Sequence, residues 1–336
     1  MGELTGSEIT KYAVTAAVWA PSVHNTQPWR FGVGEHEIAL HADTGRRLTV
    51  ADPEGREMLV SCGAALFTAR LALRSLGYIP ETRVLPDPAN PGLVARITWP
   101  CRASASEYER LLFGQVRRRR THRGGFEPVP LAPSLVAVLQ EGAAHHGARL
   151  RIVADTGRRA VLAAAVETAE HEQRLDAAQV RELANWSPPP GSPRRDGVPC
   201  TSYPVRMQRT EPNFPCRDFA HGHAWGLAQL SSVPPPRGAG VVCLLTTAGD
   251  SAADWVNAGQ ALQRVLLTAS MSGVAAALHS QPTELSWLRE FIRMELANRS
   301  YPQLVLRLGA VIQTAVSVRR SPTDVLLAPG AVTGHG

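Results

Sequence analysis

The chain has 336 residues, of which 44% are hydrophobic and 19% are charged, and its formal net charge is +6. This balance is typical of a globular protein, and the length suits two domains better than one. No uncharged apolar run approaches the ~18 residues of a membrane-spanning helix, and the first residues lack the basic start and apolar run of a signal peptide. We therefore expect a cytoplasmic protein that does not bind membranes.

The cysteine and lysine content narrows the chemistry further. The five cysteines are odd in number, widely spaced and without a CxxC pair, which argues against a disulfide framework. Lys11 is the only lysine, so the other basic residues are arginines. A Walker A loop needs a lysine on the phosphates, and a pyridoxal phosphate enzyme needs a Schiff-base lysine. The composition therefore excludes the first class and disfavours the second.

Apolar periodicity predicts helices and strands over the first 120 residues. Ser7 is a candidate N-cap of the first helix, Pro21 a candidate end, and Gly77 a candidate stop of the second. The predicted elements are, in order, a helix over 7–20, strands over 29–33 and 37–41, a long apolar helix over 55–76, a strand over 92–99 and a helix over 104–120.

The remaining residues repeat this order. The predicted elements are a helix over 131–144, strands over 150–154 and 241–247, a long helix over 251–272 and a strand over 303–309. Placing Gly63 over Gly259 aligns the two long helices without gaps, and LVARI at 93–97 matches LVLRL at 304–308. We interpret this order as a duplication, with an N-terminal half at 1–100 and a C-terminal half at 101–336.

A segment of different character interrupts the second half between about 171 and 238. It begins within a polar, alanine-rich helix predicted over 158–186 and then becomes rich in proline at 187–199 and 233–238. Proline lacks the amide donor that a strand ladder needs, and so long an irregular segment is usually a functional lid or disordered. Because His221, His223 and Trp225 are unusual in disordered chain, we favour a lid.

Three short segments carry the polar residues that suit a ligand. APSVHNTQPWRF at 20–31 is a helix end followed by a polar turn, whose alternative role is to satisfy the local backbone. RRRRTHRGGF at 117–126 combines arginines with Thr121, a candidate N-cap, which suits phosphate, although an arginine run can also be a solvated face or a nucleic-acid patch. VRRSPTDV at 318–325 could close over the same anion or be a surface tail.

Two other kinds of site were weighed against these segments. Nucleic-acid binding is disfavoured, because neither interleaved aromatic residues nor a wider basic face is evident. Cys200, Cys216, His221 and His223 could form a zinc site, but their spacing matches no standard pattern, so no metal site is predicted. No nucleophile elbow, dinucleotide fingerprint or zinc-protease motif is present.

Together the three segments resemble the nitroreductase family of flavoproteins, in its Acg-type branch of fused, single-chain members. The resemblance covers about residues 10–325 and implies an α+β fold with FMN between two halves. In the family FMN lies at a homodimer interface, where opening and closing basic residues of one subunit hold its phosphate and the APSxxNxQPW-like turn of the other reaches across. Here the turn lies in the first half and the basic segments in the second, which implies one complete site in a pseudo-dimer.

The resemblance implies roles for individual residues. Arg119, Arg120, Thr121 and Arg123 match the opening of the phosphate site, and Arg319 and Arg320 match its close. The cofactor-binding residues are therefore expected to be Pro21, Ser22, Asn25 and Gln27 of the turn, Arg119, Arg120, Thr121 and Arg123, Ser280 and Gln281 along the flavin edge, and Arg319 and Arg320.

The implied chemistry is transfer of hydride from NAD(P)H through FMN to a small organic acceptor or a substrate of redox tailoring. Flavin performs the redox step, so no catalytic side chain is predicted. The alternative is a protein that binds or sequesters flavin without turnover, because the lid could exclude substrate. The partners are then small molecules, without nucleic acid or membrane. Since the internal interface is already used, a monomer is expected, with a weaker homodimer as the alternative.

Overall fold

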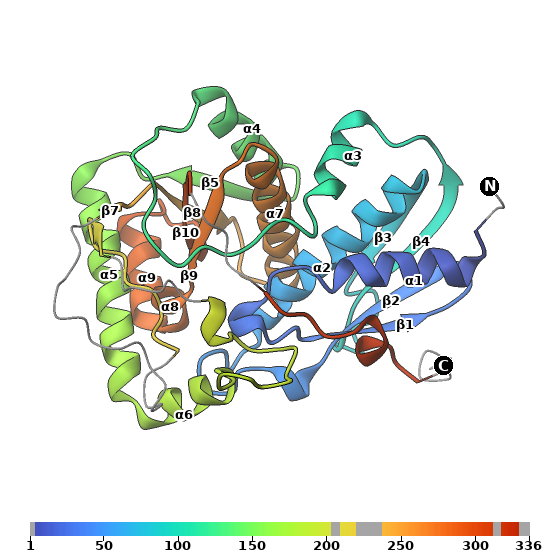
Figure 1. Cartoon of the computed structure of the whole chain (residues 1–336), viewed down its shortest axis with the longest axis horizontal. Coiled ribbons are helices and arrows are strands. Elements are labelled where there is room, and N and C mark those ends of the chain that lie inside the picture. The colour runs from blue at the N-terminus through green and yellow to red at the C-terminus, as the bar shows by residue number, and fades with distance from the viewer. Residues whose placement is uncertain (1–3, 203–208, 220–236, 312–316, 329–336) are drawn as a thin grey trace.

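The computed structural model describes residues 4–202, 209–219, 237–311 and 317–328, and it has the expected α+β architecture (Figure 1). The helices are α1 (Gly6–Ala17), α2 (Arg56–Ser75), α3 (Glu107–Gly114), α4 (Pro133–Ala144), α5 (Thr156–Leu175), α6 (Ala177–Asn185), α7 (Ala252–Met271), α8 (Gln281–Glu284) and α9 (Ser286–Glu295). The strands are β1 (Trp29–Val33), β2 (Glu37–Ala42), β3 (Tyr78–Val84), β4 (Leu93–Arg102), β5 (Ala148–Ile152), β6 (Thr210–Glu211), β7 (Arg237–Gly238), β8 (Val241–Thr247), β9 (Ala275–His279) and β10 (Tyr301–Gly309).

Two four-stranded sheets of the same topology form the framework. Their orders are β1-β2-β4-β3 and β5-β8-β10-β9, and every neighbouring pair is antiparallel. In sequence, α1, β1, β2, α2, β3 and β4 of the first half correspond to α4, β5, β8, α7, β9 and β10 of the second. Arg96 and Arg307, which the sequence alignment superposes, lie on the corresponding strands β4 and β10.

Helices α2 and α7 cross in the middle of the molecule at the two aligned glycines (Figure 1). A Cβ atom on Gly63 would overlap the carbonyl oxygen of Val256, and one on Gly259 would overlap the carbonyl oxygen of Val60. Val60 and Val256 each precede one of the glycines by three residues, so the contact is reciprocal, as a two-fold relation between the helices requires. The two backbones touch directly at this crossing.

Some element boundaries differ from the predicted ones. Helix α1 begins after Thr5, which forms a capping box with Glu8, so the predicted N-cap Ser7 lies inside the helix. The helix predicted over 104–120 ends at Gly114, because glycine and four consecutive arginines disfavour its continuation. The helix predicted over 158–186 is divided by Asp176, whose side chain caps α6.

Strands β3 and β9 were not predicted from the sequence. Strand β3 contains Pro80 and, after the buried Tyr78, alternates exposed with half-buried residues, and β9 is mostly alanine, which has low strand propensity. Both are edge strands that pair with the buried strands β4 and β10. Tertiary pairing rather than local preference therefore makes them strands.

The segment of about 171–238 that interrupts the second half, here named the interrupted segment, lies between β5 and β8 in sequence. Its described irregular part makes hydrogen bonds and an ion pair with the first half. Asn25 donates from Nδ2 to the carbonyl of Gly197 at 2.8 Å, and Gln27 donates from Nε2 to the carbonyl of Arg195 at 2.9 Å. Arg46 forms an ion pair with Asp196. Residues 203–208 and 220–236, with most of the second proline-rich stretch and His221, His223 and Trp225, lie outside the described residues.

The C-terminal tail also returns to the first half. Leu326 pairs with Phe31 of β1, and the amide of Leu327 donates to the Phe31 carbonyl at 2.9 Å. The 3₁₀ turn η4 (Pro322–Val325) buries Val325 in the core of the first half. The tail residues 317–320 are thereby held beside the turn that follows α1.

Helix α2 is the one described helix whose length and apolar composition would permit a membrane span. Of the most apolar 18-residue stretch of this helix, 83% is buried inside the protein. It is the central helix of the first half, so this feature is weak evidence for a membrane span.

The helix crossing leads to a stability prediction. We expect Gly63→Ala to destabilise the protein by ~1–3 kcal/mol, because the added methyl group must push the two backbones apart. Denaturant unfolding measures this loss. Gly114→Ala is the matched control, since a Cβ there meets nothing within 4 Å. Equal stability of the two variants would contradict the close crossing.

Candidate functional site

The turn between α1 and β1 has an unusual backbone conformation. His24, Asn25 and Gln27 have φ values of 46°, 54° and 50°, in the left-handed region that non-glycine residues seldom adopt. Two hydroxyl groups hold the turn: Ser61 of α2 accepts from the amide of Val23 at 3.2 Å, and Ser22 accepts from the amide of Gln27 at 2.9 Å. Such strain persists where the surroundings enforce it, and it is common at ligand sites.

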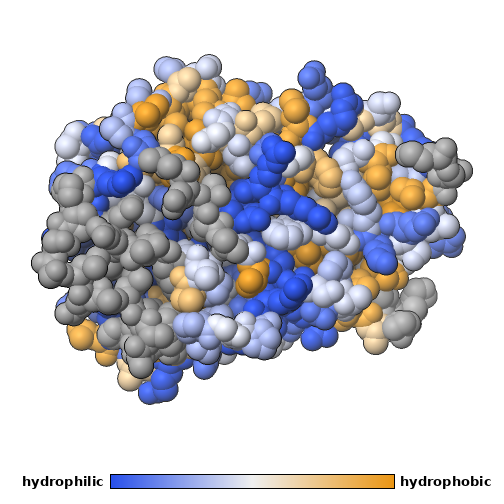
Figure 2. All heavy atoms as spheres, viewed as in Figure 1, coloured by the Kyte–Doolittle hydropathy of each residue, from blue (hydrophilic) through white to orange (hydrophobic). Residues whose placement is uncertain are grey.

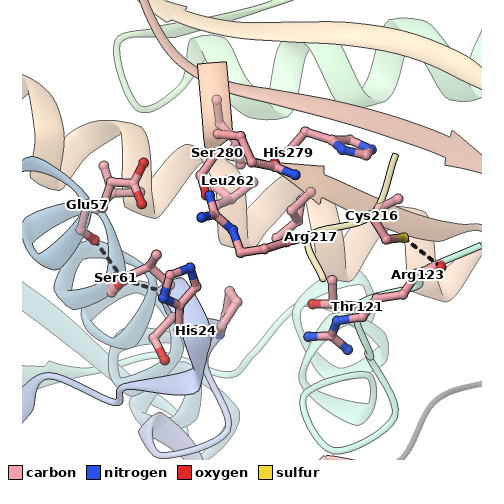
Figure 3. A pocket seen from close by; sticks show the side chains of 18 of the residues that line it. His24, Glu57, Ser61, Thr121, Arg123, Cys216, Arg217, Leu262, His279 and Ser280 are labelled. Atoms are coloured by element: carbon pink, nitrogen blue, oxygen red, sulfur yellow. Dashed lines mark hydrogen bonds between the residues drawn. The ribbon is translucent and has the colours of Figure 1, made fainter. Parts of the chain in front are cut away.

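This turn forms one wall of a cavity of about 120 Å³ between the two halves (Figure 3). The first half contributes the turn and the first two turns of α2, and the second half contributes β9, the start of β10 and the segment around Thr121. Lining residues include Pro21, Ser22, His24, Glu57, Ser61, Thr121, Arg123, Cys216, Arg217, His279, Ser280 and Gln281. The predicted turn, opening segment and flavin-edge loop therefore meet at one place.

A smaller cavity of about 30 Å³ adjoins this one. The two share Pro21, Ser22, Thr121 and Arg123 in their walls, and the smaller cavity adds Asn25 and Arg319. The tail therefore brings Arg319 to the residues that the sequence analysis expected beside it.

The predicted opening segment reaches the site by pairing with the second sheet. Thr121 forms a bridge to Ala276 of β9, and the amide of His122 donates to the Ala276 carbonyl at 2.8 Å. Thr121 therefore does not cap a helix, contrary to the prediction. Its pairing instead places Arg123 and the Thr121 hydroxyl at the cavity.

Four arginines gather beside the smaller cavity, and two of them are deeply buried. Arg119 and Arg319 are 4% and 8% exposed. Burial lowers the pKa of Arg119 to about 10, with further lowering by Arg120 and Arg123. Burial also lowers the pKa of Arg319 well below its usual range, again with the help of its arginine neighbours. The four guanidinium groups thus repel one another in a poorly solvated place.

The buried guanidinium groups have N–H donors without acceptors. Nε and Nη1 of Arg119 and Nε of Arg319 have no hydrogen-bond partner among the described residues. Their other contacts are weak or neutral: both reach the carbonyl of Trp19 at 3.5 Å, and Arg319 donates to Oδ1 of Asn25 at 3.0 Å. Since a buried charge normally has a counter-charge, this cluster has the chemistry of a site for an anion.

Three other predicted residues make mainly internal contacts. Gln27 is fully buried, and its Oε1 accepts from the amide of Arg320 at 2.8 Å. The Arg320 guanidinium donates to the carbonyls of Gln27 and Asp324. Neither residue lines the two cavities. Asn25 lines the smaller one, but its amide is used to hold Gly197, Val318 and Arg319 in place.

The other predicted residues lie at the edges of the site. Arg120 stacks over Trp19 and lines a cavity of about 290 Å³ at the end of α7. Ser280 donates to Glu284 at 2.7 Å, and Gln281 donates to Glu170 at 3.2 Å, while both also line the central cavity. Figure 2 shows hydrophilic side chains gathered in the middle of the molecular face seen in Figure 1, between the two halves.

The cavity also contains titratable residues that the sequence analysis missed. Arg217 and Glu284 form a buried ion pair at 2.7 Å, which joins the interrupted segment to α8. Neither ring nitrogen of His24 has a hydrogen-bond partner in the part of the chain that the structure describes, and burial, followed by Arg217, lowers the pKa of His24 to about 3. In the sequence, His24 stands out only as part of the polar turn, and no motif or residue spacing points to Arg217 or Glu284.

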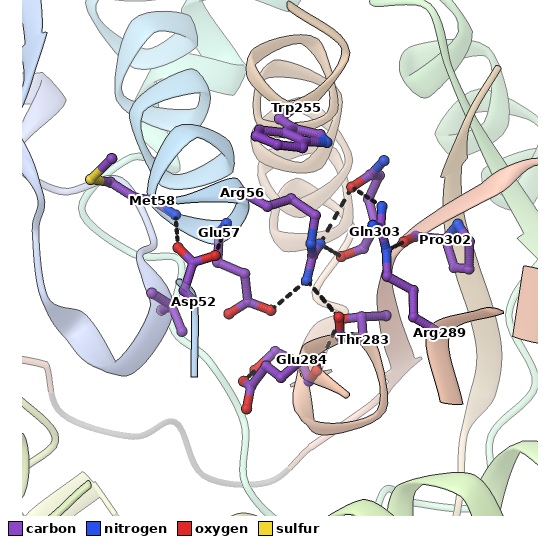
Figure 4. Close-up of polar contacts among 12 residues, drawn as sticks. Asp52, Arg56, Glu57, Met58, Trp255, Thr283, Glu284, Arg289, Pro302 and Gln303 are labelled. Carbon is purple, nitrogen blue, oxygen red and sulfur yellow. Dashed lines mark hydrogen bonds and ion pairs between the residues drawn. The ribbon is translucent and has the colours of Figure 1, made fainter. Parts of the chain in front are cut away.

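Glu57 occupies the first turn of α2 and faces this group (Figures 3 and 4). Its Oε1 accepts from Arg56 at 2.9 Å, while its Oε2 has no hydrogen-bond partner within the described ranges. Burial and the nearby Glu284 raise the pKa of the Glu57 carboxyl well above its usual range, against the opposing effect of Arg56. Glu57 is therefore a carboxyl group that favours its neutral form.

Arg56 links α2 to the second half (Figure 4). Its guanidinium donates to the carbonyl of Gln303 at 2.8 Å and to the carbonyl of Thr283 at 3.1 Å. Asp52 accepts from the amides of Glu57 and Met58 and thereby caps the same helix end. These contacts fix the end of α2 that carries Glu57 and Ser61 into the cavity.

The structure describes only part of the candidate zinc site, which comprises Cys200, Cys216, His221 and His223. Cys200 and Cys216 are free thiols, and Cys216 donates from Sγ to the carbonyl of Arg123 at 2.7 Å. His221 and His223 lie outside the described residues. Within the part of the chain that the structure covers, no group of His, Cys, Asp and Glu side chains is arranged to hold a metal.

Comparisons with known proteins place the chain in a family. No family model matches it. It is 34% identical over 307 residues to a Mycobacterium tuberculosis protein with the provisional name NAD(P)H nitroreductase Rv3131, a match that spans 90% of this chain and 85% of the relative. The chain belongs to the nitroreductase family.

A further relative identifies the branch. The chain is 29% identical over 305 residues to the M. tuberculosis protein provisionally named NAD(P)H nitroreductase acg, over 90% of this chain and 89% of the relative. This nitroreductase-family chain is therefore of the Acg type. A solved structure of the FMN-dependent nitroreductase NfnB from Mycobacterium smegmatis in complex with NADPH is 19% identical, covers 64% of this chain and 93% of its own, and has a TM-score of 0.36.

The Glu57 carboxyl of this nitroreductase-family protein predicts a pH-dependent effect. Folding raises the pKa of the Glu57 carboxyl, so this group contributes fully to stability below its unfolded-state pKa of about 4.3. The contribution is lost as the pH rises through the higher pKa of the folded state. Glu57→Gln removes this loss. We therefore expect the stability of this variant, relative to the unmodified protein, to increase as the pH rises from about 4 to about 8.

Urea unfolding over this pH range measures the difference. Glu290→Gln is the control, because the pKa of this exposed carboxyl is lowered by Arg293 and its substitution should have the opposite, weaker trend. A Glu57→Gln difference that does not change with pH would contradict the buried neutral carboxyl.

Proposed function

We propose that the protein is an FMN-dependent NAD(P)H oxidoreductase with one flavin site between its two halves. The observation that carries this proposal is the pair of buried guanidinium groups of Arg119 and Arg319, which have N–H donors without acceptors among the described residues. Arg319 lines the smaller cavity, and Arg119 is its charged neighbour. The provisional names of the two M. tuberculosis relatives, both NAD(P)H nitroreductases, support the same reaction class.

The residues fit a phosphate at the smaller cavity. Arg123 and Arg319 line this cavity and would supply charge-assisted N–H donors, and Thr121 would supply a hydroxyl. Arg119, the charged neighbour of Arg319, would add its positive charge from beside the cavity. An anion there would offset the burial, and the repulsion between arginines, that lower the pKa values of Arg119 and Arg319. Because Arg320 donates to internal carbonyls, we assign it to holding the tail rather than to the phosphate.

The larger cavity suits the ring of the same cofactor. Pro21, Ser22 and His24 would bound one side of the ring, and Ser280 and Gln281 the other. When bound, FMN supplies the hydride chemistry between NAD(P)H and a small organic acceptor. The protein needs no nucleophile of its own for such a reaction, so its residues act by binding, orientation and exclusion of water.

We also infer that the two halves form an intramolecular pseudo-dimer, with a boundary near residue 100. The matching order of strands and the reciprocal contact of Gly63 and Gly259 support this inference. Only the first half carries the APSVHNTQPW turn, whereas AAHHGARLR at 143–151 stands at the corresponding place in the second. One flavin per chain is therefore expected, and a monomer needs no further interface, with a weaker homodimer as the alternative.

A second candidate function is flavin binding without turnover. The observation in its favour is that Phe219, from the described part of the interrupted segment, lines the central cavity and packs edge-on against His24, with ring centroids 5.1 Å apart. The buried ion pair between Arg217 and Glu284 fastens this segment to α8. We infer that the segment is a lid whose opening decides between the two functions.

Replacement of Arg319 tests the phosphate assignment. We expect Arg319→Ala to weaken FMN binding by ~1.5–3 kcal/mol, or roughly 10- to 150-fold in Kd, because a charge-assisted contact is lost. Fluorescence titration of free FMN measures the affinity. Arg320→Ala is the matched neighbour, and it should leave the affinity almost unchanged because its guanidinium points elsewhere. Equal losses in both variants would refute the assignment.

Visible absorption separates the two functions. We expect the purified protein to show a flavin spectrum that bleaches under anaerobic NADPH or NADH, as an oxidoreductase requires. A spectrum that stays oxidised with both donors would favour flavin sequestration. Failure to bind added FMN would overturn both functions.

A further inference from the structure

Another cavity, of about 510 Å³, lies away from the proposed flavin site, near the C-terminal end of α2. Its walls come from α2, α3, the start of β3, the turn between α4 and β5, and α7. The central cavity instead adjoins Glu57 and Ser61, near the N-terminal end of α2. The two cavities therefore share no lining residue and open at different places along this helix.

Two arginines of this cavity have no carboxylate partner among the described residues. Arg70 donates to the neutral amide oxygen of Gln260 at 2.6 Å, and its Nε has no acceptor. Arg264 stacks at 5.9 Å over the ring of Tyr108, and its Nε also has no acceptor. Arg74, by contrast, is neutralised by Glu109 in a two-point contact at 2.7 and 3.0 Å. The cavity thus carries an uncompensated positive charge.

A neutral histidine adds a polar atom to the same wall. Burial, followed by Arg70 and Arg264, lowers the pKa of His146 to about 4, so its ring is uncharged near pH 7. Its Nε2 has no hydrogen-bond partner among the residues that the structure describes. The ring packs edge-on against Phe67, with centroids 5.4 Å apart. Aromatic surfaces of Phe67 and Tyr108 therefore stand next to cationic and polar groups.

The duplication places this cavity opposite a comparable one in the second half. Under the alignment of Gly63 with Gly259, four of its lining positions, 70, 74, 79 and 80, correspond to 266, 270, 275 and 276. Those four residues line the cavity of about 290 Å³ that also contains Arg118, Arg119 and Arg120. Each half therefore has a cavity with arginines at the end of its central helix, although the arginines come from different elements.

We propose that the cavity lined by Arg70, Arg264, His146, Tyr108 and Phe67 binds a small aromatic anion, a ring that carries a phosphate or carboxylate group. The two guanidinium groups supply charge-assisted hydrogen bonds to the anion, and the neutral imidazole adds one more polar contact. The aromatic side chains and Leu112 provide the apolar surface for the ring. This site does not depend on the proposed flavin site.

Isothermal titration of the full chain with phenyl phosphate tests the proposal. We expect binding that Arg70→Gln and Arg264→Gln each weaken about tenfold or more, as loss of a charge-assisted contact does. Arg293→Gln replaces a half-buried arginine that is paired with Glu290 and lies outside this cavity's lining; it is the charge-matched control and should have no effect. Arg319→Ala should also retain binding, which separates this site from the proposed phosphate site of the flavin.

Two further measurements keep the test independent of how the variants fold. The His146 ring signals in the NMR spectrum of the unmodified protein should shift on titration with phenyl phosphate, and inorganic phosphate should bind more weakly because it lacks the ring. The proposal is overturned if phenyl phosphate does not bind, if Arg319→Ala abolishes binding while Arg70→Gln and Arg264→Gln preserve it, or if the His146 signals stay unchanged. Equal affinity for inorganic phosphate would overturn the aromatic part of the ligand class.

Discussion

The direct contact of two helix backbones at Gly63 and Gly259 is the constraint on which the rest of the structure depends. Any side chain at either position would overlap a carbonyl oxygen of the opposite helix, so the close approach of α2 and α7 requires both glycines. This approach sets the separation of the two sheets. It thereby also sets the width of the space between the turn after α1 and strand β9, where the central cavity lies.

The site is assembled by segments that cross from one half to the other. The tail crosses to the first half and carries Arg319, and the interrupted segment also crosses and is held at Gly197 by Asn25. The Asn25 side chain therefore organises the site through contacts with these two chain segments, a role for which a short side chain with two donors and an acceptor is suited. The cofactor site that we propose therefore depends on these two segments that pass from one half to the other, as well as on its arginines.

Burial of unpaired charge is a stability penalty that the fold tolerates at this site. Arg119 and Arg319 are held close to Arg120 and Arg123 with lowered pKa values, and Glu57 faces the same cavity as a carboxyl that resists ionisation. Groups of this kind are concentrated at functional sites, because a bound ligand can offset their unfavourable desolvation. The strained backbone of His24 and Asn25 is a second cost at the same place.

Much of this protein followed from its sequence alone, because the signals were local. The two long helices, the strands at Trp29–Val33 and Val241–Thr247 and the stop at Gly77 all express periodicity and turn chemistry. The APSVHNTQPW turn and the arginine segments identified the family, since their residues are contiguous. Edge strands β3 and β9 could not be predicted, because pairing with β4 and β10 rather than propensity decides them. Only the tertiary structure distinguished Arg319, which lines the smaller cavity, from Arg320, which donates to backbone carbonyls. Only the tertiary structure brought together His24, Glu57, Arg217 and Glu284, because their interaction depends on burial between segments that are distant in sequence.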